Sequence, residues 1–370
     1  MSALFSPIDL RGVALPNRIV VSPMCQYSAE DGRATDWHML HLGHLALSGA
    51  GLLFVEATAV EADGRITPAD LGLYDDATEA ALVPVLAAIR RYSKSKVAIQ
   101  LAHAGRKASS YVPWEGGQQI PVAQGGWVTS APSAAPHKDG EEAPAALDAA
   151  GLARVRDAFV ATAKRAVRLG FDAFELHGAH GYLLHQFLSP LANQRTDQYG
   201  GSLENRMRFP LEVFDAVRAV VPADKPVGIR ISATDWVEGG FDVEQAIAFA
   251  LELKKRNVDW IDTSSGGVSP LQKIPVGPGY QVPLADAVKK ATGLPTMAVG
   301  LITDAQQAED IIASGKADFV ALARGMLYDP RWPWHAAATL GGEVDAPPQY
   351  WRSQPSDQKQ LFGKTVGGAR

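Results

Sequence analysis

Cysteine is almost absent from this 370-residue chain, which contains only Cys25. One cysteine excludes an intrachain disulfide framework, a cysteine-ligated zinc site and a four-cysteine iron–sulfur cluster. A single free thiol is typical of a reducing compartment, so we expect a cytoplasmic protein.

Runs of positive charge and long apolar runs are also missing. The formal net charge is -5 and no basic cluster occurs, so we expect no nucleic-acid partner. The most apolar stretch, residues 49–60, contains Glu56 and is too short to cross a bilayer. The first twelve residues lack the basic and then apolar pattern of a signal peptide. We therefore expect neither a secreted protein nor a membrane partner.

No glycine-rich dinucleotide fingerprint follows the first expected strand. Gly49-Ala50-Gly51 lacks a third glycine and precedes a strand rather than a helix, which argues against a Rossmann domain. The chain instead alternates short β-branched runs with longer amphipathic runs, a pattern that indicates βα units and a parallel sheet. The expected strands cover residues 18–23, 52–57, 97–101, 173–176, 227–231, 260–263, 296–299 and 319–322.

Helical patterns lie between most of these strands. They cover residues 37–48, 79–92, 152–169, 203–221, 243–256, 285–292 and 305–314. Ser202 is the expected N-cap of one pattern, and Pro210 lies inside it, so we expect two pieces or a kink there. Eight strands and about eight helices favour an α/β fold of the (β/α)8 TIM-barrel type, with a doubly wound sheet as the alternative.

We expect one domain over residues 1–370, with three additions to the barrel. Residues 8–15 form an N-terminal hairpin that closes the bottom of the barrel. Residues 107–147, rich in glycine, proline, alanine and tryptophan, form a long loop insertion after strand 3, and loops of this length usually act as lids or are disordered. Residues 347–370 form a C-terminal segment whose polar end is loose.

Active sites of barrels lie at the carboxyl ends of the strands. Polar and sulfur-containing side chains follow the first five strands, whereas glycines and an arginine follow the last two. Barrels commonly bind phosphate at that second position, so we expect a phosphorylated cofactor across the mouth. The first set includes Cys25, Tyr27, Gln100, His103, His177, His180, Tyr182 and Arg230, and the second set includes Gly300, Ala323, Arg324 and Gly325.

The segment from His177 to Tyr182 carries the most specific chemistry. Two imidazole N–H groups that converge on one point form an oxyanion hole, and a nearby tyrosine delivers a proton. Reduction of an enone needs this set, because hydride reaches the β-carbon, charge builds on the carbonyl oxygen and the α-carbon is then protonated. His-x-x-His also suits a metal, so a metal-dependent hydrolase or lyase that uses His103, His177 and His180 is an alternative.

A lyase with a Schiff-base lysine is a second competing function. It needs a lysine inside a strand, and only Lys96, at the wrong end, is near one.

Single residues of the rim also have simpler explanations. Cys25 alone is more often a small buried side chain than a functional thiol, and Arg230 could be a structural ion-pair partner. Lys107 fits a solvated loop, and His103 fits a buttress of the pocket.

Four motifs together resemble the old yellow enzyme family, most closely its bacterial subclass with a cysteine beside the flavin. The resemblance extends from about Pro7 to Tyr350. The first three motifs are Pro23-Met24-Cys25-Gln26-Tyr27, Gln100-Leu101-Ala102-His103-Ala104-Gly105-Arg106 and His177-Gly178-Ala179-His180-Gly181-Tyr182. The most specific one is Arg195-Thr196-Asp197-Gln198-Tyr199-Gly200-Gly201-Ser202-Leu203-Glu204-Asn205-Arg206.

The resemblance implies an FMN-dependent ene-reductase that reduces the C=C bond of α,β-unsaturated carbonyl or nitro compounds with NADPH or NADH. It implies a substrate carbonyl held by Tyr27, His177 and His180, and a proton from Tyr182. Two positions depart from commoner family patterns, His180 in place of asparagine and Ala323 in place of glycine. The implied cofactor contacts are Ser22, Pro23, Met24, Cys25, Ala59, Gln100, Arg230, Gly300, Ala323 and Arg324.

The sequence Pro347-Pro348-Gln349-Tyr350-Trp351-Arg352 predicts an extended, stiff segment. Tyrosine, tryptophan and arginine are frequent interface anchors, so the segment is expected to dock. The resemblance implies that it reaches the neighbouring subunit's active site, with Trp351 and Arg352 as substrate contacts. We therefore expect a homodimer or a dimer of dimers, with docking on the chain's own barrel as the alternative.

Overall fold

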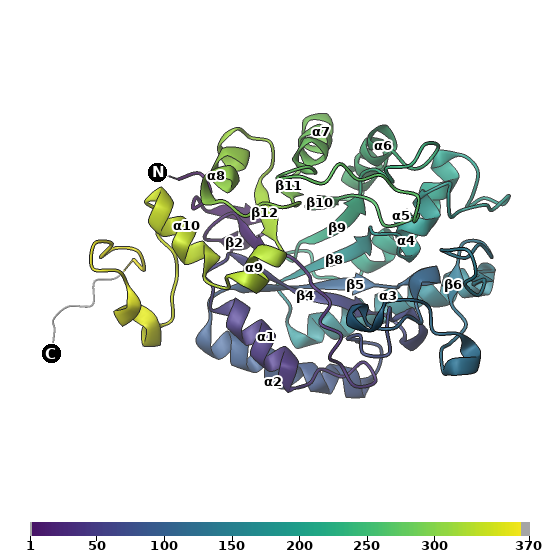
Figure 1. Ribbon diagram of the computed structural model, residues 1–370, viewed down its shortest axis with the longest axis horizontal. Coiled ribbons are helices and arrows are strands. Elements are labelled where there is room, and N and C mark those ends of the chain that lie inside the picture. Colours follow the sequence, from purple (N-terminus) through teal and green to yellow (C-terminus); the bar gives the residue numbers. More distant parts are fainter. Residues whose placement is uncertain (1, 364–370) are drawn as a thin grey trace.

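Eight parallel strands close into a barrel in the computed structural model of the protein, which describes residues 2–363 (Figure 1). β12 pairs with β3 and completes the ring, so the barrel prediction is confirmed and the doubly wound alternative is wrong. The barrel strands are β3 (Ile19–Val21), β4 (Leu52–Ala59), β5 (Lys96–Ala102), β8 (Ala173–Gly178), β9 (Val227–Ser232), β10 (Ile261–Ser264), β11 (Thr296–Ala298) and β12 (Phe319–Leu322).

Helices surround the barrel and connect successive strands (Figure 1). The long ones are α1 (Asp36–Ala46), α2 (Asp76–Tyr92), α3 (Ala149–Leu169), α5 (Leu203–Arg218), α6 (Val243–Lys254), α7 (Val282–Thr292), α8 (Ala305–Ala313) and α10 (Trp332–Leu340). The expected helices agree with seven of these to within about one turn. The short helices α4 (Leu183–Leu188) and α9 (Arg324–Tyr328) are not in the sequence prediction. Every residue of α4 is buried, so α4 has no amphipathic period to detect.

Side-chain caps fix where many of the helices begin. Each capping oxygen accepts a hydrogen bond from the backbone N–H three residues later, which satisfies a donor that has no partner inside the helix. The capping residues are Asp75, Asp148, Ser202, Asp242 and Asp304. The N-cap predicted at Ser202 is therefore confirmed.

Helix α5 runs without a break through Pro210, so of the two predicted outcomes, two pieces or a kink, the division into two pieces is wrong. Proline removes one backbone hydrogen bond from a helix interior. Phe209, Val213 and Phe214 on the same helix are almost completely buried, and packing of this apolar face holds the helix together across the missing bond.

The N-terminal hairpin closes the amino end of the barrel, as predicted. β1 (Ile8–Leu10) and β2 (Val13–Leu15) pair antiparallel, and Arg11 and Gly12 between them have positive φ angles, as a tight two-residue hairpin turn requires. Leu10 and Leu15 pack into the apolar cluster inside the barrel.

The loop insertion after β5 lies at the opposite end of the barrel from the C-terminal segment (Figure 1). It contains the 3-10 helices η3 (Pro113–Glu115) and η4 (Val122–Gln124) and the short strand pair β6 (Ser130–Ala131) and β7 (Ala145–Ala146). The Arg106 guanidinium donates to the carbonyl oxygens of Ala135 and Pro136, at 3.1 and 3.2 Å. The guanidinium of Arg195, from the most specific family motif, donates to the carbonyl oxygens of Pro132 and Leu147. These buried donors anchor the insertion to the rim.

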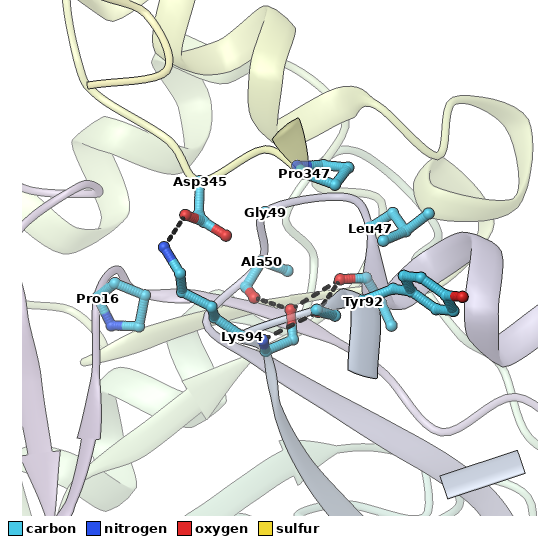
Figure 2. A pocket seen from close by; sticks show the side chains of 11 residues that line it. Pro16, Leu47, Gly49, Ala50, Tyr92, Lys94, Asp345 and Pro347 are labelled. Atoms are coloured by element: carbon cyan, nitrogen blue, oxygen red, sulfur yellow. Dashed lines mark hydrogen bonds and ion pairs between the residues drawn. The ribbon is translucent and has the colours of Figure 1, made fainter. Parts of the chain in front are cut away.

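Figure 2 shows the small cleft where the C-terminal segment crosses the amino ends of β4 and β5. Lys94 Nζ lies 2.7 Å from Asp345 Oδ1, and the Ser95 hydroxyl donates to the Ala50 carbonyl oxygen at 2.9 Å. Pro347 lines the same cleft. The C-terminal segment therefore leaves the barrel at the end away from the carboxyl ends of the strands.

Beyond Pro347 the chain forms the 3-10 helix η5 (Pro348–Ser353), so the predicted extended conformation is wrong. Proline has the φ angle that a first helical position needs, and Pro348 occupies that position. Trp351 Nε1 donates to the Ala346 carbonyl oxygen at 2.9 Å, and the Tyr350 ring lies 6.1 Å from the ring of Trp334. Tyr350 and Trp351 thus dock on their own chain. Residues 364–370, the end of the expected segment, lie outside the described residues.

Trp260 packs closely against the backbone of Gly228 of β9 inside the barrel. A Cβ atom on Gly228 would lie 2.0 Å from Cε2 of the fully buried Trp260 ring. Only a residue without a side chain leaves room for the indole at this point.

We expect Gly228→Ala to lower the free energy of unfolding by about 1–3 kcal/mol, because the Trp260 ring must move in a close-packed interior. Urea denaturation followed by tryptophan fluorescence measures the change. Gly43→Ala in α1 is the matched control, since a Cβ there meets nothing within 4 Å and alanine favours a helix by roughly 0.5–1 kcal/mol. Equal stability of the two variants would contradict the packing argument.

Candidate active site

The carboxyl ends of β9 to β12 surround a cavity that holds about 560 Å³ of space. The predicted phosphate residues Gly300, Ala323 and Arg324 line it together with Ser22 and Arg230. Residues from opposite ends of the sequence meet here because β12 pairs with β3. The expected cofactor contacts from both ends of the chain therefore share one cavity.

Three features of this cavity fit a flavin mononucleotide. Ser22 Oγ is buried and has no hydrogen-bond partner among the described residues, so it can serve a polar ligand. Gly300 has φ 114°, and a Cβ there would lie 2.8 Å from Gln281 Nε2, so glycine keeps the cavity open. Arg324 supplies a permanent positive charge that suits a phosphate.

His177, His180 and Tyr182 come together at the end of β8. The ring centroid of His177 lies 5.1 Å from that of His180 and 5.0 Å from that of Tyr182, and both pairs of rings are nearly perpendicular. The backbone N–H of His180, whose φ is 57°, donates to Ser232 Oγ at 2.9 Å. The Gly181 N–H donates to Nδ1 of the buried His185 at 2.8 Å. These bonds hold the three side chains in a fixed arrangement.

Both imidazoles at the end of β8 are neutral. Burial, followed by the charge of Arg230, holds the pKa of His177 and of His180 well below the ordinary range. His177 Nδ1 accepts the Ala179 N–H, so the proton of this ring is on Nε2. His180 Nε2 lies 2.7 Å from Ser264 Oγ, and the ring proton is on Nδ1 when that hydroxyl donates to Nε2. Each histidine then has one N–H group for a ligand.

Lys107 is part of this cluster, not a solvated loop lysine. Its ammonium donates to the carbonyl oxygens of His180 and Gly267, at 2.8 and 3.0 Å, and lies 5.0 Å from the centroid of the Tyr182 ring. Burial, together with the charge of Arg106, lowers the pKa of Lys107 to about 8. Because both carbonyl groups hold the ammonium, the structure does not favour a Schiff-base role.

Cys25 and Tyr27 follow β3 on the side of the rim near β4. Burial, with the nearby carboxylates Asp70 and Glu56, raises the pKa of the Cys25 thiol well above its ordinary value. Burial likewise raises the pKa of the Tyr27 phenol, and the Tyr27 ring meets Trp114 of the insertion edge-on at 5.8 Å. Both groups are therefore protonated at neutral pH.

The insertion and the rim enclose a second cavity, of about 710 Å³. Tyr27 and Lys107 line its inner side, and Tyr111, His137 and Lys138 of the insertion line its outer side. Lys107 lines this cavity and also belongs to the histidine cluster, so the two adjoin.

Two further cofactor residues of the prediction lie on β4 and β5. Ala59 is buried and lines a small cavity that Tyr182 also borders. Gln100 is buried, and its Nε2 donates to Glu175 of β8 at 2.8 Å. Pro23 and Met24 are partly buried in the turn that leads to Cys25.

The structure does not bring together the three histidines that a metal-dependent hydrolase or lyase would use. His103 Nε2 lies 2.9 Å from Glu61, away from His177 and His180, so His103 acts as a buttress. Among residues 2–363, the one carboxylate–histidine group with metal-ligand spacing comprises Glu61, Asp63 and His103. The guanidinium of Arg154 lies 2.5 Å from Glu61 and 3.8 Å from Asp63, so a cation from the chain itself already pairs with this group.

Trp351 and Arg352 do not join the site of their own chain. Trp351 packs on the cluster around α10, and Arg352 is exposed.

Sequence reasoning missed Ser264, which bonds His180, and Glu175, which bonds Gln100. Both residues follow or lie in expected strands, but their partners come from other strands, so no local pattern reveals them.

Among the described residues, no helix is both long and apolar enough to cross a membrane.

Comparisons with known proteins agree with this geometry. The profile of the NADH:flavin oxidoreductase / NADH oxidase family matches residues 3–342. An NADPH dehydrogenase of Geobacillus sp. (strain WCH70) is 45% identical over 351 residues, covering 94% of this chain and 98% of that protein. An NADPH dehydrogenase of Bacillus licheniformis is 45% identical over 352 residues, covering 95% of this chain and 98% of that protein.

A solved structure of morphinone reductase in complex with tetrahydroNAD superposes with a TM-score of 0.75 at 27% identity, covering 98% of this chain and 95% of that one. The family profile and the relatives each span nearly the whole barrel. The chain therefore belongs to the NADH:flavin oxidoreductase / NADH oxidase family, the old yellow enzyme family that its motifs resemble, and is a flavin-dependent oxidoreductase.

Proposed function

We propose that the protein is an NAD(P)H-dependent, FMN-containing ene-reductase that reduces the C=C bond of α,β-unsaturated carbonyl or nitro compounds. One observation carries the proposal: two neutral imidazole N–H donors and a phenol converge at the end of β8. This cluster lies beside a cavity whose unpaired Ser22 hydroxyl and Arg324 suit a phosphorylated flavin.

In this proposal the flavin cavity binds FMN through residues from both ends of the chain. Gly300, Ala323 and Arg324 would hold the phosphate, and the turn from Ser22 to Cys25, with Ala59, Gln100 and Arg230, would contact the isoalloxazine. When bound, FMN would supply hydride to the β-carbon of the alkene. A monophosphate needs no adenine-binding module.

The two histidines stabilise the charge that develops on the substrate oxygen. Their N–H groups are donors already oriented by Ala179 and Ser264, so they need no rearrangement during the reaction. Each such donor lowers the barrier by roughly 3–4 kcal/mol in comparable sites. Neutral imidazoles suit this role, because they bind the carbonyl without transferring a full proton. Tyr27 supplies a further donor from the β3 side.

Tyr182 protonates the α-carbon in the proposed reaction. Burial raises the pKa of its phenol well above the ordinary value, so the phenol keeps its proton until the carbon becomes basic. A positioned proton donor of this kind contributes about 10²–10⁴-fold to the rate. Cys25, a neutral thiol beside the flavin, alters the reduction potential of the flavin. It does not form a covalent intermediate.

The dinucleotide reaches the flavin from solution through the cavity beneath the insertion. NADPH is favoured as the donor because the bacterial relatives are named NADPH dehydrogenases. Arg106, Lys107 and Lys138 make this entrance positively charged, which suits a polyphosphate.

Residues 107–147 act as a lid in this proposal, within one domain that spans the chain. We place the enzyme in the cytoplasm.

Heat-released cofactor tests this function directly. The purified protein should be yellow, and chromatography of the released flavin should yield FMN, because the cavity suits a monophosphate. Anaerobic NADPH should bleach the visible spectrum. FAD in place of FMN, or a colourless protein that cannot be reconstituted with FMN, would refute the proposal.

Tyr182→Phe separates the two half-reactions. We expect NADPH oxidation to continue, because hydride transfer to the flavin does not use the phenol, whereas enone reduction should fall by about 10²-fold. Anaerobic stopped-flow kinetics of each half-reaction measures the difference. Tyr199→Phe removes a hydroxyl that contacts Glu212, away from the rim, and serves as the control. An unchanged enone rate in Tyr182→Phe would assign the proton donor elsewhere.

We also propose a homodimer or a dimer of dimers in which Trp351 and Arg352 reach the partner's site. The exposure of Arg352 and the departure of its segment from the far end of the barrel favour a role outside its own site. Arg352→Ala should therefore reduce enone turnover about tenfold with an unchanged melting temperature, since a buried interfacial charge contributes about 1.4 kcal/mol or more.

The exposed Lys359, on the same segment, supplies the control variant Lys359→Ala. Light scattering of the wild-type protein reports the oligomeric state. A monomeric, fully active enzyme, or an Arg352→Ala variant with full turnover, would exclude shared active sites.

A further inference from the structure

Two buried carboxyl groups lie inside the barrel below the flavin cavity and take no part in the proposed mechanism. Glu175 of β8 is 0% exposed and Asp262 of β10 is 1% exposed. The neighbouring interior is apolar and includes Phe54, Ala98 and Met297. A carboxyl group in such surroundings loses hydration, so its retention requires compensating partners.

Glu175 connects two side chains that reach it from different strands. Its Oε1 accepts from Gln100 Nε2 at 2.8 Å, and its Oε2 accepts from Trp260 Nε1 at 2.9 Å. Because the amide nitrogen of Gln100 faces Glu175, the amide oxygen of Gln100 is left for the flavin side. Glu175 thus decides which atom of Gln100 a ligand meets.

Asp262 holds the second polar residue expected beside the flavin. Its Oδ2 lies 3.2 Å from Arg230 Nε, while neither carboxylate oxygen of Asp262 makes a hydrogen bond among the described residues. The strand register places Arg230 between His177 on β8 and Asp262 on β10. The Asp262 carboxylate is therefore an ion-pair partner that acts through its charge.

The two carboxyl groups influence each other. Burial, then the charge of Asp262, raises the pKa of Glu175 to about 8, while Arg230 and the two hydrogen bonds oppose that rise. Burial also raises the pKa of Asp262. Each carboxyl group of the pair therefore keeps its proton to a higher pH than an exposed, isolated carboxyl group does.

We propose that Glu175 and Asp262 are positioning residues that fix the polar atoms of Gln100 and Arg230 facing the flavin and thereby set its reduction potential. This inference rests on the proposed function, because it assumes that FMN binds above Gln100 and Arg230. Reduced flavin carries more negative charge than oxidised flavin, so the donors, acceptors and charges below it decide how readily it accepts electrons.

Glu175→Gln tests the inference by changing one atom. The introduced amide must use its single carbonyl oxygen for the Trp260 N–H, so its own N–H group faces Gln100 and turns the Gln100 carbonyl away from the flavin. A donor then replaces an acceptor on the flavin side. This change favours reduced FMN. Its affinity relative to oxidised FMN should rise about tenfold, which moves the two-electron potential by about +30 mV.

Asp262→Asn is the second variant and should shift the potential in the same direction, because it removes the counter-charge of Arg230. Dye-coupled redox titration measures the potential, and thermal melting of each protein checks its folding. Asp235→Asn is the control: this buried carboxylate contacts His185 and Ser189 but neither Gln100 nor Arg230, so the potential should stay at the wild-type value.

A purely structural role for the two carboxyl groups predicts a lower melting temperature with an unchanged potential. Folded, FMN-loaded variants that keep the wild-type potential would therefore overturn the inference. If Glu175→Gln does not fold, Asp262→Asn decides alone. A wild-type protein that binds no FMN would instead overturn the proposed function, before any potential is compared.

Discussion

Closure of the parallel sheet is the constraint on which the rest of the structure depends. Pairing of β12 with β3 leaves no strand edge and brings all carboxyl ends to one rim. Ser22, near the start of the chain, thereby meets Arg324, near its end, in one cavity. Because each strand contributes only its last residues to the rim, the site is assembled from short, distant pieces of sequence.

The barrel interior has two layers with different physical requirements. Toward the amino ends, the hairpin residues Leu10 and Leu15 fill the barrel, and Trp260 packs over Gly228. Toward the carboxyl ends, Gln100, Glu175 and Arg230 replace apolar side chains. Trp260 belongs to both layers, because its ring packs in the apolar cluster while its N–H group binds Glu175. Trp260 therefore contributes both to the stability of the barrel and to the polar environment of the flavin cavity.

Burial produces the chemical states that the rim requires. It keeps the histidines at the end of β8 neutral, so that they donate hydrogen bonds, and keeps the Tyr182 phenol protonated. It also lowers the pKa of Lys107 to about 8, although two carbonyl groups hold its ammonium. Hydrogen bonds from backbone and hydroxyl groups then orient these side chains. Burial also raises the pKa of Glu175, inside the barrel, to about 8. The same physical cause therefore acts on the rim and on the interior.

The sequence by itself determined the α/β barrel, the hairpin, the insertion and the motif from His177 to Tyr182. Each of these depends on the spacing of apolar residues or on residues that are neighbours in the chain, and both can be read directly from a sequence. It failed for α4, which has no polar face, and it left open a break at Pro210, where packing of the buried face keeps helix α5 continuous. Only the tertiary structure decided that Lys107 joins Tyr182, that Ser264 orients His180, and that Glu175 holds Gln100. Those pairs come from different strands and loops, and closure of the barrel, not proximity in sequence, brings them within hydrogen-bonding or ring-contact distance.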